Sequence, residues 1–506
     1  MSLDVALTSS QSGLALVNRQ LGAASQNVAN AAVAGFTRKT VEGRALTADG
    51  LSFGVRSLQA QRDVDAALQT QIEVTRASRA AAAVREAILR PVEAAHGTPG
   101  GDGGGGDSAG DLTASLHAAF VALRADPSDA PRQNAVVAAA NDLAERFNAV
   151  GDAIQTARQE SQDAMQRDVA TLNSGLRDIG VLTREIQSLQ SRGLSTAAME
   201  DKRDTAIGGL SEVLELKAIR QADGGVLLIA RGGTVLPTDG RQDPFSLAPA
   251  TVAPGTWHGA GGTLPGVMLG GVDVTNRLMG GTLAEHVALR DSVLPRQQAE
   301  VDVAAANVAG RLNAQGLALF VDGAGAVPDP ALPYATGGWI GLAGTLRVNP
   351  AIIANPALAR DGTHAVAGFT PNPAAGPAGF ATLLTRVDIQ AFGAESAPGV
   401  PHPGFANSGL GPDGTLSSTL SGARTLQEQT ANLVAAHGAD RLAATEALST
   451  GNAFLSLLEA RAGERSGVDV DREMASLVSL QTAYAANARV MSAVQTMYDT
   501  LLAAVR

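Results

Sequence analysis

The sequence contains no cysteine among its 506 residues, and aromatic residues make up only 3% of it. The absence of cysteine excludes disulfide bonds, thiolate catalysis and cysteine-ligated metal sites. Because the hydrophobic fraction still reaches 45%, small apolar side chains must supply much of it, which indicates closely packed helices rather than a bulky core. No uncharged apolar run approaches the roughly 18 residues of a membrane-spanning helix, so we expect no membrane segment.

Positive charge is also scarce. The 38 lysines and arginines are outnumbered by 49 aspartates and glutamates, which gives a net charge of −11, and lysine occurs only at Lys39, Lys202 and Lys217. Nucleic-acid binding needs a concentrated basic surface, so we expect neither a nucleic-acid partner nor attraction to an anionic membrane. The first residues lack the basic segment of a secretory signal peptide, so any export is expected to occur without cleavage.

The residue types that carry most enzyme and metal chemistry do not occur in the required patterns. None of the seven histidines lies four positions from another, and the sequence His-Glu-x-x-His does not occur. The glycine-rich stretch 97–111 lacks the Gly-Lys-Ser/Thr of a phosphate-binding loop. We therefore predict no catalytic, cofactor-binding or metal-binding residues, and no enzymatic activity.

Both ends of the chain carry apolar residues at heptad spacing, which is typical of coiled coils. The N-terminal window, residues 3–28, contains only two charged residues, and the C-terminal repeat contains one amide, Asn487. A single amide in such a seam can fix register and partner number. The predicted assembly seam consists of Leu3, Leu7, Leu14, Val17, Leu21, Val28, Leu477, Leu480, Tyr484, Asn487, Met491, Val494, Tyr498 and Leu501.

We expect the two terminal seams to pair with each other and with neighbouring copies. Ordering about 30 terminal residues costs roughly 1–2 kcal/mol each, whereas burying eight or nine seam side chains returns roughly 1.5–3 kcal/mol each. Isolated helices in water are marginal even with their hydrogen bonds. The ends are therefore predicted to be loosely ordered in the monomer and to become rigid on assembly. The alternative is that both are ordinary amphipathic helices on a globular core.

Between the ends, the pattern predicts a mainly α protein with a β-containing middle and nested, elongated domains. Long helical periodicity favours a helix bundle, while stretches rich in glycine and proline favour hairpins and loops. The predicted segments are 1–57, a coiled-coil helix and its exit loop; 58–219, the first part of a helical domain; 220–282, a hairpin and further β structure; 283–319, a helical return; 320–415, an irregular, partly β outer segment; 416–466, the last helical part; and 467–506, the C-terminal coiled-coil helix.

Two terminal stretches resemble motifs of the bacterial flagellar axial proteins. NVANAAVAGF, residues 27–36, is similar to the N-terminal motif of that family, and QTAYAANARVMSAVQTMYDTLL, residues 481–502, is similar to its C-terminal motif. The motif positions at the N-terminal end are Asn27, Asn30, Gly35 and Phe36, the last standing where tyrosine is common. Glycine permits the turn out of the inner helix, and the asparagines can bond exposed backbone groups at a helix end. Gly22 is expected to allow close helix approach.

Internal stretches are similar to the hook–filament junction members of that family. They are QRDVDAALQTQI (61–72), MEDKRDTAIGGLSEVLEL (199–216), and GGTLAEHVALRDSVLP with LNAQGLAL, both within 280–319. Lys202 stands where glutamine is common. The polar residues of these motifs are expected to form ion pairs or helix caps rather than acid–base sites; they are Asp201, Arg203, Asp204, Arg290 and Asp291.

The resemblance implies a structural subunit of the bacterial flagellum that joins hook to filament and lies outside the cell after unfolded export through the type III apparatus. The implied partners are further copies of the chain, the hook protein, other hook-associated proteins, the filament cap and a cytoplasmic export chaperone on the C-terminal helix. Two alternatives stay open. Another axial subunit, such as a hook or rod protein, would have a β-rich body directly after residue 58. A secreted binding module would use a ligand site within 320–415.

Overall fold

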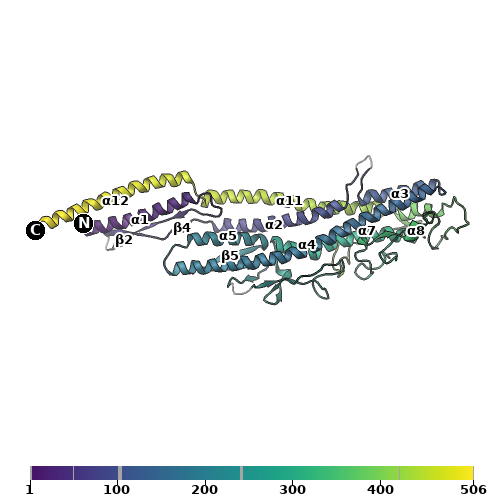
Figure 1. Ribbon diagram of the computed structural model, residues 1–506, viewed down its shortest axis with the longest axis horizontal. Coiled ribbons are helices and arrows are strands. Elements are labelled where there is room, and N and C mark those ends of the chain that lie inside the picture. Colours follow the sequence, from purple (N-terminus) through teal and green to yellow (C-terminus); the bar gives the residue numbers. More distant parts are fainter. Residues whose placement is uncertain (1–2, 49–50, 101–104, 240–242, 421, 505–506) are drawn as a thin grey trace.

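The computed structural model describes residues 3–48, 51–100, 105–239, 243–420 and 422–504. Figure 1 shows an elongated molecule in which long helices run lengthwise and both termini lie at the same end. The predicted architecture, a mainly α chain with paired terminal helices, a long-helix bundle and a β-containing middle, is confirmed.

Helices form most of the described chain. They are α1 (Leu3–Ala29), α2 (Ala66–Ala95), α3 (Ala109–Ala125), α4 (Ala130–Ser191), α5 (Ala197–Val213), α6 (Gly281–Ala288), α7 (Leu294–Ala314), α8 (Pro350–Ala354), α9 (Leu358–Asp361), α10 (Thr382–Arg386), α11 (Leu426–Ser466) and α12 (Val470–Ala504). Short 3₁₀ turns occur at Thr275–Arg277 and Leu342–Gly344, and π-helical turns occur at Leu289–Val293 and Val387–Ala391.

The strands are short and pair antiparallel in small, separate sheets. Two-stranded sheets join β1 (Lys39–Thr40) with β4 (Gln61–Arg62), β2 (Gly43–Ala48) with β3 (Leu51–Ser57), β11 (Phe320–Val321) with β12 (Arg347–Val348), and β13 (Glu395–Ala397) with β14 (Val400–Pro401). Three-stranded sheets join β5 (Leu216–Arg220), β6 (Val226–Ala230) and β7 (Val235–Leu236), and β8 (Phe245–Ser246), β9 (Met268–Leu269) and β10 (Val272–Asp273).

Local sequence signals account for several helix boundaries. Asp65 caps α2 by accepting from the backbone nitrogens of Ala67 and Leu68. Reciprocal capping boxes begin α3 at Ser108 and α11 at Thr425, and each satisfies backbone donors that have no partner within the helix. α11 ends before Gly467. The side chain of Asp469 then accepts from the nitrogen of Arg472 at the start of α12.

The 62 residues of α4 form one helix although the sequence offers glycines as weak points. Gly151 lies against the 3₁₀ turn at Gly344, where an added Cβ would come within 2.8 Å of the Gly344 backbone nitrogen. This glycine therefore allows close packing of a loop onto the helix, and it does not break the helix.

Two large hydrophobic cores share α4. The first core combines the first half of α4 with α2, α3, α7 and α11, and the second core combines the second half of α4 with α5 and the strands of 216–274. Residues 320–415 contribute Phe320, Trp339, Phe392 and other large side chains to the first core. That irregular segment therefore completes the core of the bundle at the end far from the termini (Figure 1).

One β element lies where the sequence indicates only an exit loop. Strands β2 and β3 form a hairpin that packs along α1. The backbone nitrogen of Val55 donates to the hydroxyl of Ser12 at 3.1 Å, and Gly54 has a positive φ of 123° beside the same serine. The hairpin therefore covers one side of the N-terminal helix.

Candidate assembly site

The terminal helices α1 and α12 lie side by side and run in opposite directions (Figure 1). Near the termini, the hydroxyl of Tyr498 donates to Asp4 Oδ1 at 3.1 Å, and this bond raises the pKa of Tyr498. Further along, Asn487 lies against Gly13, where a Cβ would be 3.3 Å from the amide oxygen. The amide nitrogen of Asn487 donates to the carbonyl of Ala483 at 3.1 Å. The glycine thus makes room for the one amide of the seam.

The seam residues differ in how far this pairing buries them. Val17 and Val494 are buried, while Tyr484 and Leu501 are exposed. The side chain of Leu3 lies outside the described residues. Gly22 is exposed and has open space where a Cβ would stand, so it makes no close approach to another described part of the chain. The half-buried members of the seam are Leu7, Leu14, Leu21, Val28, Leu477, Leu480, Asn487, Met491 and Tyr498.

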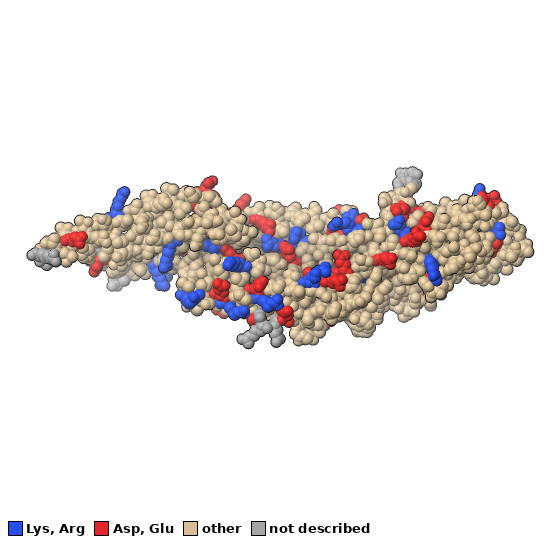
Figure 2. All heavy atoms as spheres, viewed as in Figure 1, with Lys and Arg blue, Asp and Glu red and all other residues tan. Residues whose placement is uncertain are grey.

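α12 also carries apolar side chains that the described part of the chain leaves largely exposed. Val478 is 62% exposed, Met497 54% and Leu502 65%. Between Glu473 and Asp499, Arg489 is the only charged residue, and Figure 2 shows a largely uncharged surface over the terminal pair. Exposed apolar surface of this extent typically marks an interaction site. These three residues, together with the seam residues Tyr484 and Leu501, point to more than one side of the helix, and we call this uncovered apolar surface the outer face of α12.

The N-terminal motif holds the chain where it leaves α1. The amide of Asn27, which is buried, donates to the carbonyl of Lys39 at 2.9 Å and accepts from the nitrogen of Lys39 at 2.9 Å. The side-chain amide of Asn30 donates to the carbonyl of Gln26, four residues earlier in the last turn of α1, at 2.8 Å. Asn27 therefore clamps the returning strand β1 to the end of α1, whereas Asn30 acts locally.

The next motif residues bring the chain against α5. Gly35 has a φ of +75°, and a Cβ there would collide with the hydroxyl of Thr205. The ammonium of Lys39 lies 3.8 Å from the centre of the Phe36 ring, which is a cation–π arrangement. The same ammonium pairs with Asp201, and both side chains are buried.

Asp201 is the centre of an ion-pair cluster that links the two sets of motif residues. Its carboxylate also accepts from Thr37, and its Oδ1 lies 3.2 Å from Arg62 Nη1. The guanidinium of Arg62 contacts Glu200 and Asp204, each at 2.7 Å. Burial opposes the charge of Arg62, but the nearby Asp204 and Glu200 outweigh it and raise the pKa of Arg62 above its usual value. We call Asn27, Thr37, Lys39, Arg62, Asp201 and Asp204 the joint.

The other motif residues on α5 fix the β5–β6 hairpin beside the joint. Arg220 on β5 donates to Asp204 Oδ1 at 2.8 Å. Arg203, which is buried, donates to the carbonyl of Gly224 at 2.7 Å, and burial lowers the pKa of this arginine. α12 meets the joint region through an ion pair of 2.6 Å between Arg38 and Glu473. The exit loop thus lies between α5 and the start of α12.

Arg290 and Asp291 lie apart from the joint, on the π-helical turn between α6 and α7. The guanidinium of Arg290 is fully buried and makes a two-point contact with Asp291 at 2.7 and 2.8 Å. It also donates to Gln162 on α4 at 2.5 Å and to the carbonyl of Pro265 at 2.9 Å. This arginine therefore fastens the β-containing loop to the bundle.

Thr37, Lys39 and Arg62 belong to the joint although the sequence motifs do not predict a role for them. Lys39 could have been identified from the sequence as a candidate, because lysine occurs only three times in the chain and this lysine lies three residues after Phe36. Arg62 lies within QRDVDAALQTQI, a stretch that resembles the junction proteins. Thr37 carried no signal beyond its place in the exit loop.

Two further features bear on the kinds of site the chain can hold. Within the described ranges, no group of three or more histidine, aspartate or glutamate side chains is arranged to hold a metal ion. Each helix in those ranges is too short or too polar to cross a bilayer.

Comparison with known proteins gives two family matches. Residues 105–324 match the family described as the flagellar hook-associated protein FlgK helical domain. Residues 461–504 match the family described as the flagellar basal body rod FlgEFG protein C-terminal. These matches confirm the resemblance to flagellar axial proteins that the terminal and internal motifs indicate.

Solved structures are also similar over part of the chain. One of them is the flagellar hook junction protein FlgK from Burkholderia pseudomallei, with 21% sequence identity and a TM-score of 0.39. The match covers 51% of this chain and 46% of that chain, so this chain spans about half the length of the solved protein. No curated protein matches the sequence.

Proposed function

We propose that this protein is a structural subunit of the bacterial flagellum that joins hook to filament. The proposal is supported by the matches to a FlgK helical domain and to a C-terminal segment of flagellar rod proteins. The proposal includes polymerisation through the terminal helices. Its function would then rest on shape and on contacts between subunits, without bond chemistry.

The observation that carries this proposal is the terminal helix pair and its outer face. α1 and α12 extend beyond the bundle at one end (Figure 1), and α12 leaves large apolar side chains such as Val478 and Met497 uncovered. A neighbouring copy or another axial subunit with a similar helix pair could bury this surface. The joint would hold the pair at a fixed position on the helical domain while that contact forms.

The partners and the location follow from the same role. The subunit would contact further copies, the hook protein, other hook-associated proteins and the filament cap, outside the cell. Export would proceed unfolded through the flagellar type III apparatus without a cleaved signal peptide. A cytoplasmic chaperone on α12 would keep the outer face from aggregating before export.

The helical body supports a junction role over the other axial roles. A hook or rod subunit is expected to have a β-rich body directly after residue 58, whereas this chain continues from a two-residue strand into α2 and then α3 and α4. The family match to a hook-associated helical domain, residues 105–324, points the same way.

Deletion of the gene tests the proposal directly. Cells should retain hooks, lack attached filaments and lose filament subunits to the medium, and the intact gene should restore filaments. Normal filaments after deletion would refute any axial role. Cells without hooks would refute the junction role and favour a rod or hook subunit.

A pair of surface variants tests the role of the outer face. Val478→Glu with Met497→Glu should leave the monomer folded, because both side chains are exposed, but should prevent restoration of filaments. Val272→Glu, equally exposed on β10 and distant from the terminal pair, is the matched control and should restore them. Equal restoration by both variants would contradict assembly through this face.

A further inference from the structure

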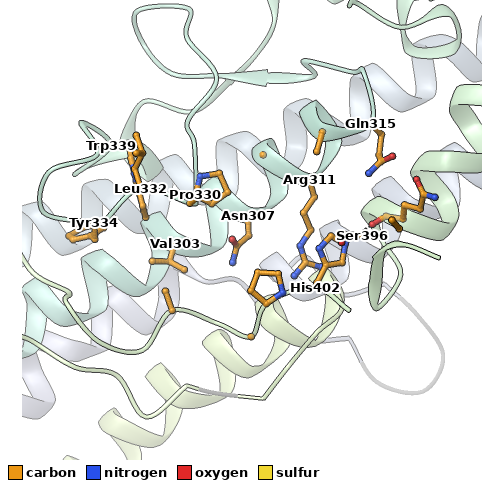
Figure 3. Close-up of a pocket in the computed structure, with 18 of the residues that line it drawn as sticks. Val303, Asn307, Arg311, Gln315, Pro330, Leu332, Tyr334, Trp339, Ser396 and His402 are labelled. Atoms are coloured by element: carbon orange, nitrogen blue, oxygen red, sulfur yellow. Dashed lines mark hydrogen bonds between the residues drawn. The ribbon is translucent and has the colours of Figure 1, made fainter. Parts of the chain in front are cut away.

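A cavity of about 740 Å³ opens beside α7, in the half of the molecule far from the termini. Figure 3 shows its labelled side chains coming from three parts of the chain. Asn307 and Arg311 project from α7, Tyr334 and Trp339 come from the following loop, and His402 comes from the segment after β14. Its volume falls within the range of roughly 300–1,000 Å³ typical of small-molecule sites.

The charges around this cavity are unusual for so acidic a protein. Its lining includes two arginines, Arg311 and Arg386, and none of the described residues that line it is an aspartate or glutamate. The chain as a whole has a net charge of −11. The carboxylate of Asp302 lies behind this lining, where it accepts from the hydroxyl of Tyr334 at 2.7 Å. The charged side chains on the lining itself are therefore both positive, which favours an anionic occupant.

Arg311 is buried without a counter-ion. Only 6% of the residue is exposed, and its Nη1 donates to the carbonyl of Arg424 at 2.6 Å. No carboxylate of the described chain forms an ion pair with it, and burial lowers its pKa to about 10, so it stays charged at neutral pH. A buried charge without a partner is costly. An anion in the cavity would supply the missing partner.

Other lining residues also lack partners. The indole nitrogen of Trp339 is a buried donor without a hydrogen-bond partner among the described residues. The amide oxygen of Gln315, just past the end of α7, also lacks a partner there, but as an acceptor it cannot pair with an anion. His402 lies next to Arg311 (Figure 3), and its Nε2 contacts the carbonyl of Gln390 at 2.6 Å. Burial and the charge of Arg311 lower the pKa of His402, so the imidazole adds no second cation at neutral pH.

We propose that this cavity binds an organic carboxylate with an apolar body. The planar guanidinium of Arg311 suits two-point recognition of a carboxylate. Pro330, Leu332, Tyr334 and Trp339 would cover the apolar part. A phosphate group is disfavoured, because a strongly hydrated dianion would need more donors than this mostly apolar lining offers. The carboxylate could belong to a free small acid or to the C-terminus of a peptide.

The test uses phenylacetate against its neutral counterpart phenylacetamide, with the full chain. The chain has only two tryptophans, so in a Trp257→Phe background the fluorescence of Trp339 reports on the cavity, and calorimetry measures affinity. Phenylacetate should bind and phenylacetamide should bind at least tenfold more weakly. A peptide ending in Leu-Phe, compared with its C-terminal amide, then distinguishes a chain terminus from a free acid as the source.

Substitution of Arg311 separates binding from folding. Arg311→Met should weaken phenylacetate binding by about tenfold to a hundredfold, the loss of one charge-assisted contact. It should keep or raise the melting temperature, because it removes an unpaired buried charge. Arg347→Met, an exposed arginine on β12 outside the lining, is the matched control and should bind as the parent does. Arg311→Lys keeps the charge and should retain part of the affinity, which preserves the test if the methionine variant does not fold.

The proposal is overturned if neither phenylacetate nor the peptide acid binds at millimolar concentration. It is equally overturned if the amides bind as well as the acids, or if Arg311→Met and Arg311→Lys both leave the affinity unchanged.

Discussion

Asp201 accepts hydrogen bonds from both the backbone nitrogen and the hydroxyl of Thr37, at 3.2 and 2.7 Å, across 164 residues of sequence. The same carboxylate pairs with Lys39 and Arg62. Since Thr37 lies in the exit loop and Asp201 on α5, this contact fixes the terminal helices to the helical domain. The resemblance supplied the two motifs separately, and the structure joins them in one place.

The first prediction concerns the central carboxylate of the joint. Asp201→Asn leaves the buried Lys39 without its anion, and breaking a buried pair from one side costs about 3–5 kcal/mol. We expect the free energy of unfolding to fall by that order in chemical denaturation, with faster amide exchange in residues 30–39. Glu200→Gln, whose carboxylate is more exposed, is the control and should cost about 1 kcal/mol or less. A loss below 1 kcal/mol for Asp201→Asn would contradict the role of the joint.

The two motif asparagines should differ sharply in their effects on stability. Asn27→Ala removes both bonds to the Lys39 backbone and leaves a donor and an acceptor unsatisfied, each costing about 1–3 kcal/mol. Asn30→Ala loses only a bond to its own helix, so we expect a change of about 1 kcal/mol or less. Thermal unfolding of the two variants side by side measures the difference. Equal losses would show that Asn27 is not the clamp.

Glu73 should make stability depend on pH. Burial on α2 raises the pKa of Glu73 to about 7, even though Gln69, Arg220 and Arg76 oppose the shift; Asp204 adds to it. A carboxyl whose pKa is raised in the folded state does not lower the free energy of unfolding at pH values below its unfolded-state pKa, near 4.5. As the pH rises from there towards 7, the free energy of unfolding falls progressively. Glu73→Gln should therefore match the parent at about pH 4 and exceed it by about 3 kcal/mol at about pH 8.

Denaturation of the parent and the Glu73→Gln variant across this pH range isolates the contribution of Glu73 from other titrating groups. Parallel curves with no divergence above pH 5 would show that Glu73 is solvated in solution.

Glycine substitutions in α1 test which surfaces are packed in the monomer. Gly22 has open space where a Cβ would stand, so Gly22→Ala should stabilise the helix by about 0.5–1 kcal/mol. At Gly13 a Cβ would press on Asn487, so Gly13→Ala should gain less or lose stability. If Gly22→Ala stabilises the monomer but impairs filament restoration, then Gly22 lies at a contact between subunits. Equal gains at both positions would contradict the observed helix pairing.

Removal of the terminal segments should separate folding from assembly. Both large cores are built from residues 88–433, and the third small cluster joins only α2 and α11. A chain of residues 58–466 should therefore remain helical, soluble and monomeric by circular dichroism and light scattering. In cells it should fail to restore filaments, and incorporation of this shortened chain would refute assembly through the terminal helices.

The terminal helices could be predicted from sequence because heptad spacing and scarce charge are local signals. The hairpin of β2 and β3 could not, since its stability comes from packing along α1, through contacts such as Ser12 with Val55. The exposure of Tyr484 and Leu501 could not be predicted from the heptad pattern either. Heptad spacing identifies a row of apolar residues along a helix, but not how much of that row one partner helix covers.

The joint and the cavity depend on long-range contacts that one sequence does not reveal. Lys39 and Asp201 were each visible as residues, but nothing local indicated that they meet. The residues that line the cavity are spread over 303–410. Most of this range falls in the segment 320–415, for which the sequence predicts only irregular, partly β structure. Glycine and proline frequency predicts an irregular segment there but cannot show that its aromatic side chains complete a core.

The continuity of α4 has a mechanical consequence. At about 1.5 Å per residue its 62 residues span about 93 Å, and both large cores are built on it. The two halves cannot hinge against each other without rupturing consecutive backbone hydrogen bonds of this one helix. A twist applied to the bundle where it meets the joint is therefore transmitted along this helix to the opposite end of the bundle.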